Sequence, residues 1–227
     1  MPQEVINFGW YMEVGSEDLG SSRFADAVIA FKHAADAAYS TYEVACAHQM
    51  QGVALRLNRK LEEAHVAFGT ATLYARGNDE LLWRINRDKA MVYMDEGKLR
   101  HASDLLEDSF IGLININETE AGASLGFLAR VELRIGHKDE AYRLFIVTAI
   151  MLSHGDNRTY ELNNLVWLFK LVSPFVRPIL LPRALRLIRQ TGQRRRLVEV
   201  ALLVVGGNRL YDTAERYATR RHRSPGA

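Results

Sequence analysis

Histidine, serine and cysteine are the side chains in this chain that could support catalysis or bind a metal, and their placement favours neither. The seven histidines are scattered: His65 and His101 each adjoin an alanine, and His137 falls at an expected turn. The phosphate-binding and dinucleotide-binding glycine motifs and the HExxH zinc motif are absent. We therefore expect no metal site, no cofactor and no enzymatic activity.

Two short segments carry reactive residue types with a simpler interpretation. Ser153, His154 and Asp156 are the residue types of a catalytic triad, but triad members must converge in space rather than follow one another, so a loop is expected. Cys46 is the only cysteine, which excludes an internal disulfide and fits a reducing compartment. We expect its thiol to be structural.

Asn117 and Asn157 each begin an Asn-x-Thr sequence, the acceptor pattern for N-glycosylation. Both precede expected helices, so N-terminal capping is the simpler role. Glu4 and Glu13 lie where a signal peptide would be basic, which predicts a cytoplasmic protein. The longest apolar stretch, residues 165–181, is interrupted by charged residues and prolines, so we expect no membrane association.

Charge is distributed unevenly along a chain whose net charge is only +2. From Pro174 to the C-terminus there are twelve arginines and three acidic residues, a net +9, which leaves residues 1–173 at −7. A basic region attached to an acidic one suggests an acidic partner, or packing of one half on the other in a homo-oligomer. A solvated arginine-rich tail is the alternative.

Four segments of the chain repeat one pattern, an alanine followed four residues later by a large apolar residue. The alanines are spaced by 37, 38 and 39 residues, a regularity that predicts structural repeats. The four pairs are Ala27 and Phe31, Ala64 and Phe68, Ala102 and Leu106, and Ala141 and Phe145.

A second helical segment precedes three of these alanines. Twelve residues before each one stands a small residue, Gly52, Ala90 or Ala129, and Gly97 and Gly136 mark turns between helices. Two helices of a hairpin approach closely where both present small side chains, and the large residue four positions on fills the space beyond. The pattern predicts a series of antiparallel helix pairs.

This pattern resembles the tetratricopeptide repeat, a helix-turn-helix unit, in about four divergent copies over residues 23–150. The resemblance implies an all-α fold, a right-handed α-solenoid of antiparallel helix pairs with about eleven helices. The family's tryptophan is replaced by His48, Asn86 or Leu125, its closing proline is missing, and the period exceeds the usual ~34 residues. HEAT-type repeats, which have longer periods, are the alternative.

The repeat pattern weakens after Ser153, which suggests a repeat array over residues 1–155 and an arginine-rich helical extension, residues 156–227, packed on it. Pro174, Pro178 and Pro182 predict an irregular segment with a new helix beginning near Pro182. The expected helices of the extension are Thr159–Val172, Leu181–Thr191, Arg195–Val205 and Leu210–Arg220.

The resemblance also implies a ligand site, because the first helix of each tetratricopeptide pair lines a concave groove. In that frame the groove carries arginines, with a methionine floor and two asparagines that resemble peptide-backbone clamps. These residues are Arg56, Arg84, Arg87, Met91, Arg130, Arg134, Asn163 and Asn164. Arginine forks suit carboxylate or phosphate. The alternative is that they pair with local acids such as Glu80, Asp88 and Asp95.

The function that these features favour is a non-enzymatic scaffold or adaptor that binds a protein or peptide, expected to be acidic, in the groove. One alternative is a regulatory sensor similar to the repeat halves of peptide-responsive bacterial regulators. Another is a nucleic-acid-associated protein that acts through the basic C-terminal lobe, which would give strongly salt-dependent binding. The partner's identity lies beyond what the residues encode.

Overall fold

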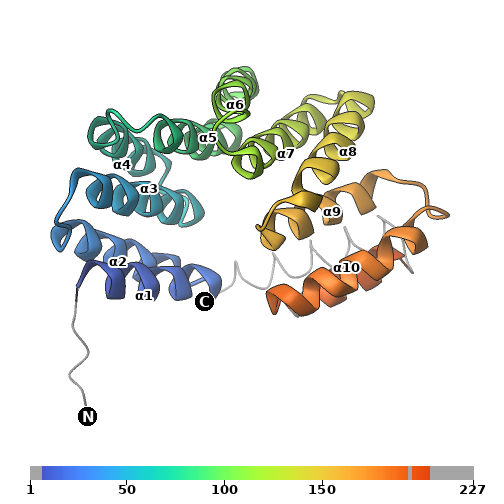
Figure 1. The fold of residues 1–227 in the computed structure, drawn as a ribbon, viewed down its shortest axis with the longest axis horizontal. Coiled ribbons are helices and arrows are strands. Elements are labelled where there is room, and N and C mark those ends of the chain that lie inside the picture. The colour runs from blue at the N-terminus through green and yellow to red at the C-terminus, as the bar shows by residue number, and fades with distance from the viewer. Residues whose placement is uncertain (1–6, 194–195, 205–227) are drawn as a thin grey trace, which may run out of the picture. The chain divides into compact units, whose positions relative to one another are not determined.

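The computed structural model describes residues 7–193 and 196–204, and every regular element in these ranges is a helix (Figure 1). Residues 196–204 are helical as well and follow α10. The ten labelled helices are α1 (Phe8–Gly20), α2 (Phe24–Asp36), α3 (Thr41–Leu57), α4 (Leu61–Tyr74), α5 (Asp79–Asp95), α6 (Leu99–Leu113), α7 (Glu118–Ile135), α8 (Lys138–His154), α9 (Arg158–Leu171) and α10 (Arg177–Thr191).

The chain divides into two compact units, residues 1–131 and residues 132–227. The division falls inside α7, not after residue 155 where the sequence suggested the array would end. A separate extension over residues 156–227 therefore stays a prediction. The first unit contains α1 to α6 and most of α7, and the second contains α8, α9, α10 and residues 196–204.

Within the first unit the helices form consecutive hairpins, α1 with α2, α3 with α4 and α5 with α6 (Figure 1). Each hairpin also packs on the next, through α2 with α3 and α4 with α5. Ala27, Ala64 and Ala102 have no exposed surface, and neither does Ala141 in the second unit. The prediction that the repeated alanines lie at helix crossings is confirmed.

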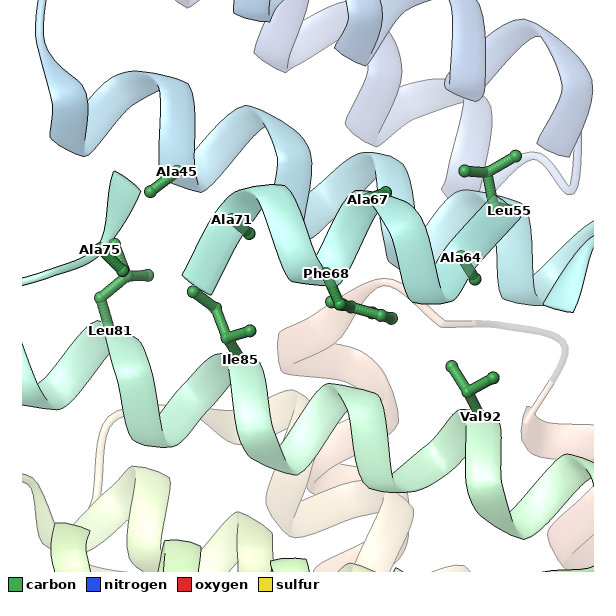
Figure 2. Close-up of a cluster of buried hydrophobic side chains, with 10 residues drawn as sticks. All are labelled: Ala45, Leu55, Ala64, Ala67, Phe68, Ala71, Ala75, Leu81, Ile85 and Val92. Carbon is green, nitrogen blue, oxygen red and sulfur yellow. The ribbon is translucent and has the colours of Figure 1, made fainter. Parts of the chain in front are cut away.

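Small residues in the first helix of a pair accept the large residue of the second. A methyl group on Gly52 would lie 2.9 Å from the Phe68 ring, and one on Gly15 would lie 2.6 Å from the Phe31 ring. Figure 2 shows Phe68 among Ala64, Ala67 and the side chains of α5. Gly15 stands twelve residues before Ala27, so α1 and α2 form a first repeat. The resemblance over residues 23–150 did not include α1.

The turn within each pair uses one left-handed residue, five positions before the alanine. Its φ is +79° at Gly97 and +110° at Gly136, as expected for glycine, but it is also positive at Ser22 (62°) and Arg59 (64°). The backbone at this position is therefore the same in all four repeats, whichever residue occupies it. A search for glycine alone finds only half of these turns.

Polar residues begin several helices and leave the first N–H groups paired. The Asn157 side chain accepts a hydrogen bond from the N–H of Tyr160, and the Asn117 side chain accepts one from the N–H of Glu120. Ser40 and Glu43 form a reciprocal capping box at the start of α3. The predicted capping role of Asn117 and Asn157 is confirmed.

In the second unit α9 packs on both α8 and α10. The predicted start of a helix near Pro182 is wrong, because α10 already begins at Arg177 and contains Pro182. Arg177 is buried and donates a hydrogen bond of 2.5 Å to the carbonyl of Leu203, so tertiary contacts outweigh the local cost of the proline. The predicted helix Leu210–Arg220 lies outside the described residues.

Candidate functional site

The first helix of each pair in the first unit carries most of the residues that the sequence predicted for the site. We define the helix-A surface as the polar sides of α3, α5 and residues 118–131 of α7. It includes Arg56, Arg84, Arg87 and Arg130, with Met91 beneath it. Arg134, Asn163 and Asn164 belong to the second unit and are described separately.

Two polar contacts join α3 to α5 along this surface. The Gln49 amide donates a hydrogen bond of 2.7 Å to Asp88, and Arg56 forms an ion pair of 2.9 Å with Asp95. The partners in each contact stand 39 residues apart, so the contacts recur with the repeat. These contacts hold neighbouring repeats together. They also leave the Arg56 guanidinium paired with Asp95 of the protein itself.

Arg87 lies at the centre of the surface and is 2% exposed. Its guanidinium pairs with Asp88 at 3.2 Å and with Glu120 of α7, and it lies 6.0 Å from the centre of the Phe127 ring. Arg87 and Arg56 are therefore paired with local acids, which is the alternative considered from the sequence. The guanidinium of Arg87 joins α5 to α7 and is covered by protein.

Arg84 differs from these two arginines because its side chain is 30% exposed. Its nearest acidic partner is Glu120, whose carboxylate is 4.0 Å from the Arg84 Nε. That Nε is buried and makes no hydrogen bond with a described residue. Arg130 is also half-buried, and its guanidinium lies over the Phe127 ring at 5.2 Å from the centre.

Tyr42 and Cys46 of α3 lie within electrostatic reach of Arg84. Burial raises the pKa of the Cys46 thiol, and a hydrogen bond to Cys46 raises the pKa of the Tyr42 hydroxyl, while the charge of Arg84 acts to lower both. Both groups therefore stay protonated at neutral pH. Tyr42 is 51% exposed, so it adds a hydroxyl and an aromatic face within electrostatic reach of Arg84.

The methionine predicted as a groove floor lies in the core. Met91 is 3% exposed and Met94 is 4% exposed. Both support α5 from below the surface, where an unbranched side chain fills irregular space.

In the second unit the two asparagines serve internal contacts. The Asn164 amide donates a hydrogen bond of 3.0 Å to the carbonyl of Phe145, and the Asn163 oxygen accepts one of 2.7 Å from Arg196. Asn163 thereby holds residues 196–204 to α9. Arg134 is exposed on the last turn of α7.

The structure adds Glu120, Asn117 and Phe127 to the residues predicted for the surface. Glu120 binds Arg87, and Asn117 donates a hydrogen bond of 2.9 Å to Glu80. The sequence signal for this pair was the capping pattern itself, since Asn117 stands three residues before Glu120. The Asn117 side chain caps α7, and the side chains of both residues contact α5.

Among the described residues no cluster of three or more metal-binding side chains occurs. The Ser153 hydroxyl, 3.3 Å from the His154 ring, donates a hydrogen bond to the carbonyl of Ile150 at the exposed end of α8. In the described part of the chain, no helix combines the length and the apolar character needed to cross a bilayer.

These helix hairpins and their small-residue crossings define a tetratricopeptide-like repeat fold, a solenoid of antiparallel helix pairs. The Rap conjugation gene regulator of plasmid pLS20, solved with the Phr* peptide, superimposes with a TM-score of 0.70 at 16% identity, over 98% of this chain and 66% of that one. The apo form of RapI gives a TM-score of 0.65 at 12% identity, over 97% and 87%.

Repeats of a putative kinesin light chain from Podosopora anserina are also similar, with a TM-score of 0.54 and 16% identity over 92% of this chain and 96% of that chain. No protein-family model matches the sequence, and no curated protein matches it. At identities of 12–16%, these similarities show that the proteins share a fold.

Proposed function

We propose that the protein is a non-enzymatic scaffold that binds a segment of a protein or peptide on the helix-A surface of its first unit. The observation that carries the proposal is Arg84, a partly exposed cation whose Nε lies 4.0 Å from the Glu120 carboxylate and makes no hydrogen bond with a described residue. Solenoid repeats bind their partners on such extended surfaces.

The charges around Arg84 favour an acidic group in the ligand. Arg56 and Arg87 are already paired within the protein, so Arg84 is the arginine of α5 with donor capacity left. A carboxylate or phosphate can take two parallel hydrogen bonds from its fork. Tyr42, which is half-exposed and within electrostatic reach of Arg84, can stack on the neighbouring part of the ligand.

The experiment uses a displayed library of random peptides selected against the full chain, followed by titration calorimetry with an enriched peptide. We expect the enriched peptides to contain acidic residues. Arg84→Ala should weaken their binding about ten-fold or more, because a hydrogen bond to a charged group contributes roughly 1.5–3 kcal/mol. The matched control is Arg76→Ala, an exposed arginine outside the surface, which should leave affinity unchanged.

Equal affinities for wild type and the Arg84→Ala variant would remove Arg84 from the site. Arg84→Lys separates charge from geometry: it should recover only part of the affinity, since an ammonium cannot make the bidentate contact. Full recovery would show that the fork is not used.

A second candidate function is a regulatory sensor that changes its affinity for another protein when a peptide binds. The observation that favours it is the TM-score of 0.70 with a regulator solved together with its peptide. Reciprocal coupling would identify it: a selected peptide should alter the amount of a second protein retained on the immobilised chain. Retention that is independent of the peptide would leave the scaffold role.

A further inference from the structure

The outer side of α6 carries an acidic stripe followed by an apolar one. Asp104, Glu107 and Asp108 are exposed, and none of them has an ion pair with a described residue. One turn further, Ile111 is 68% exposed, and Ile116, just after the helix, is 51% exposed. Asp104, Glu107, Asp108 and Ile111 have the spacings of one helix face, so this face is acidic first and then apolar, and the exposed Ile116 follows the end of the helix.

The outer side of α10 carries the complementary pattern in the reverse order. Phe175, immediately before the helix, is 91% exposed and Ile179 is 75% exposed. Arg186 and Arg189 follow on the same face, are exposed, and have no ion pair with a described residue. The helix contains no acidic residue, so its exposed face is apolar first and basic afterwards.

The two faces match when the helices run antiparallel. Asp108 opposite Arg186 then places Ile111 and Ile116 on the same side of this charged pair as Ile179 and Phe175. At about 1.5 Å per residue, the step from charged to apolar residues covers about 4.5 Å on α6, from Asp108 to Ile111, and about 10 Å on α10, from Arg186 to Ile179. The larger charge distribution agrees, because residues 1–131 carry a net −7 and residues 132–227 a net +9.

We propose that the α6 face of one molecule docks on the α10 face of a second copy of this chain. Because the two faces differ, the contact is head-to-tail and generates a ring or an open chain of molecules. A nucleic acid could satisfy the arginines of α10, but it would leave Phe175 and Ile179 exposed and would be repelled by α6. A second copy accounts for both faces.

The test is sedimentation velocity on the full chain over a range of protein and salt concentrations. Wild type should form larger particles as protein concentration rises, and added salt should reduce them. Two variants reverse one face each: Asp104→Arg with Asp108→Arg, and Arg186→Glu with Arg189→Glu. Each variant alone should raise the dissociation constant about a hundred-fold, since like charges then face one another.

Mixing the two variants provides the decisive arm, because each reversed face then meets a complementary face of the other variant. The mixture should associate at concentrations where neither variant does. The matched control, Glu13→Arg with Glu17→Arg on α1, reverses an exposed acidic pair with the same spacing and should associate as wild type does. Thermal melts of all variants verify that they are folded.

Three results would overturn the proposal. The first is a wild-type chain that stays monomeric at every concentration. The second is variants that associate as wild type does, or a mixture that fails to associate. The third is an Arg186→Glu, Arg189→Glu variant that loses binding to duplex DNA while its self-association is unchanged, which would assign the α10 face to nucleic acid.

Discussion

Replacing Arg87 with alanine is expected to destabilise the fold by about 3 kcal/mol, the lower end for removing one partner of a buried ion pair. The substitution leaves Asp88 and Glu120, each 15% exposed at the side chain, with no guanidinium between them. It also removes the cation packed near Phe127. The resemblance to the tetratricopeptide repeat had instead placed Arg87 among the ligand-binding residues of the groove.

Chemical denaturation of the purified variant, monitored by circular dichroism, measures this change. Arg56→Ala is the control, because its pair with Asp95 is more exposed and should contribute less. Adding Glu120→Gln to Arg87→Ala should restore part of the stability, since it removes a carboxylate left with only the more distant Arg84, at 4.0 Å. A midpoint for Arg87→Ala equal to that of wild type would mean that the pair does not join α5 to α7.

The second large effect is expected at Gly112 of α6. Even a methyl group at this position would overlap the indole of Trp83 on α5. Gly112→Leu should therefore cost about 1–3 kcal/mol through overpacking, despite the better helix propensity of leucine.

Gly69 of α4 offers a matched comparison, because a side chain there would meet no other atom within 4 Å. Gly69→Leu should stabilise the protein by up to about 1 kcal/mol, since glycine is a poor helix former. Thermal melts of the two variants should move in opposite directions. A Gly112→Leu variant that melts with or above wild type would show that Trp83 can move away without cost.

The repeat architecture could be predicted from the sequence because it depends on local spacing. A small residue twelve positions before each alanine, and a large one four positions after it, encode the crossing directly. The same spacing places Gly15 twelve residues before Ala27, so α1 could also have been predicted from the sequence. Turns at Ser22 and Arg59 were not, because those residue types rarely adopt a positive φ.

The chemistry of the site was harder to predict because it depends on contacts between repeats. The spacing pattern places Arg84 and Arg87 together on α5 but does not say which of them meets Glu120 at close range. Burial decides that, and burial depends on α7. Pro182 shows the same limit, since its place inside α10 follows from the buried contacts of that helix.

The structure also changes the interpretation of the arginine-rich C-terminal region. Arg177 binds the carbonyl of Leu203, Arg183 pairs with Glu161 at 2.5 Å, and Arg196 contacts Glu199 and Asn163. These three arginines hold the second unit together. In the described part of this region, the charge that remains for a partner is that of Arg186 and Arg189.

The most direct test of the central claim, that the helix-A surface binds a peptide segment, is photo-crosslinking. A library-selected peptide carrying a benzophenone would be irradiated with the full chain, and the attachment sites mapped by mass spectrometry. We predict attachment to α3 and α5, around Tyr42 and Arg84, and its loss when unlabelled peptide competes. Competable attachment confined to α2, α4, α6 or the second unit would contradict the account.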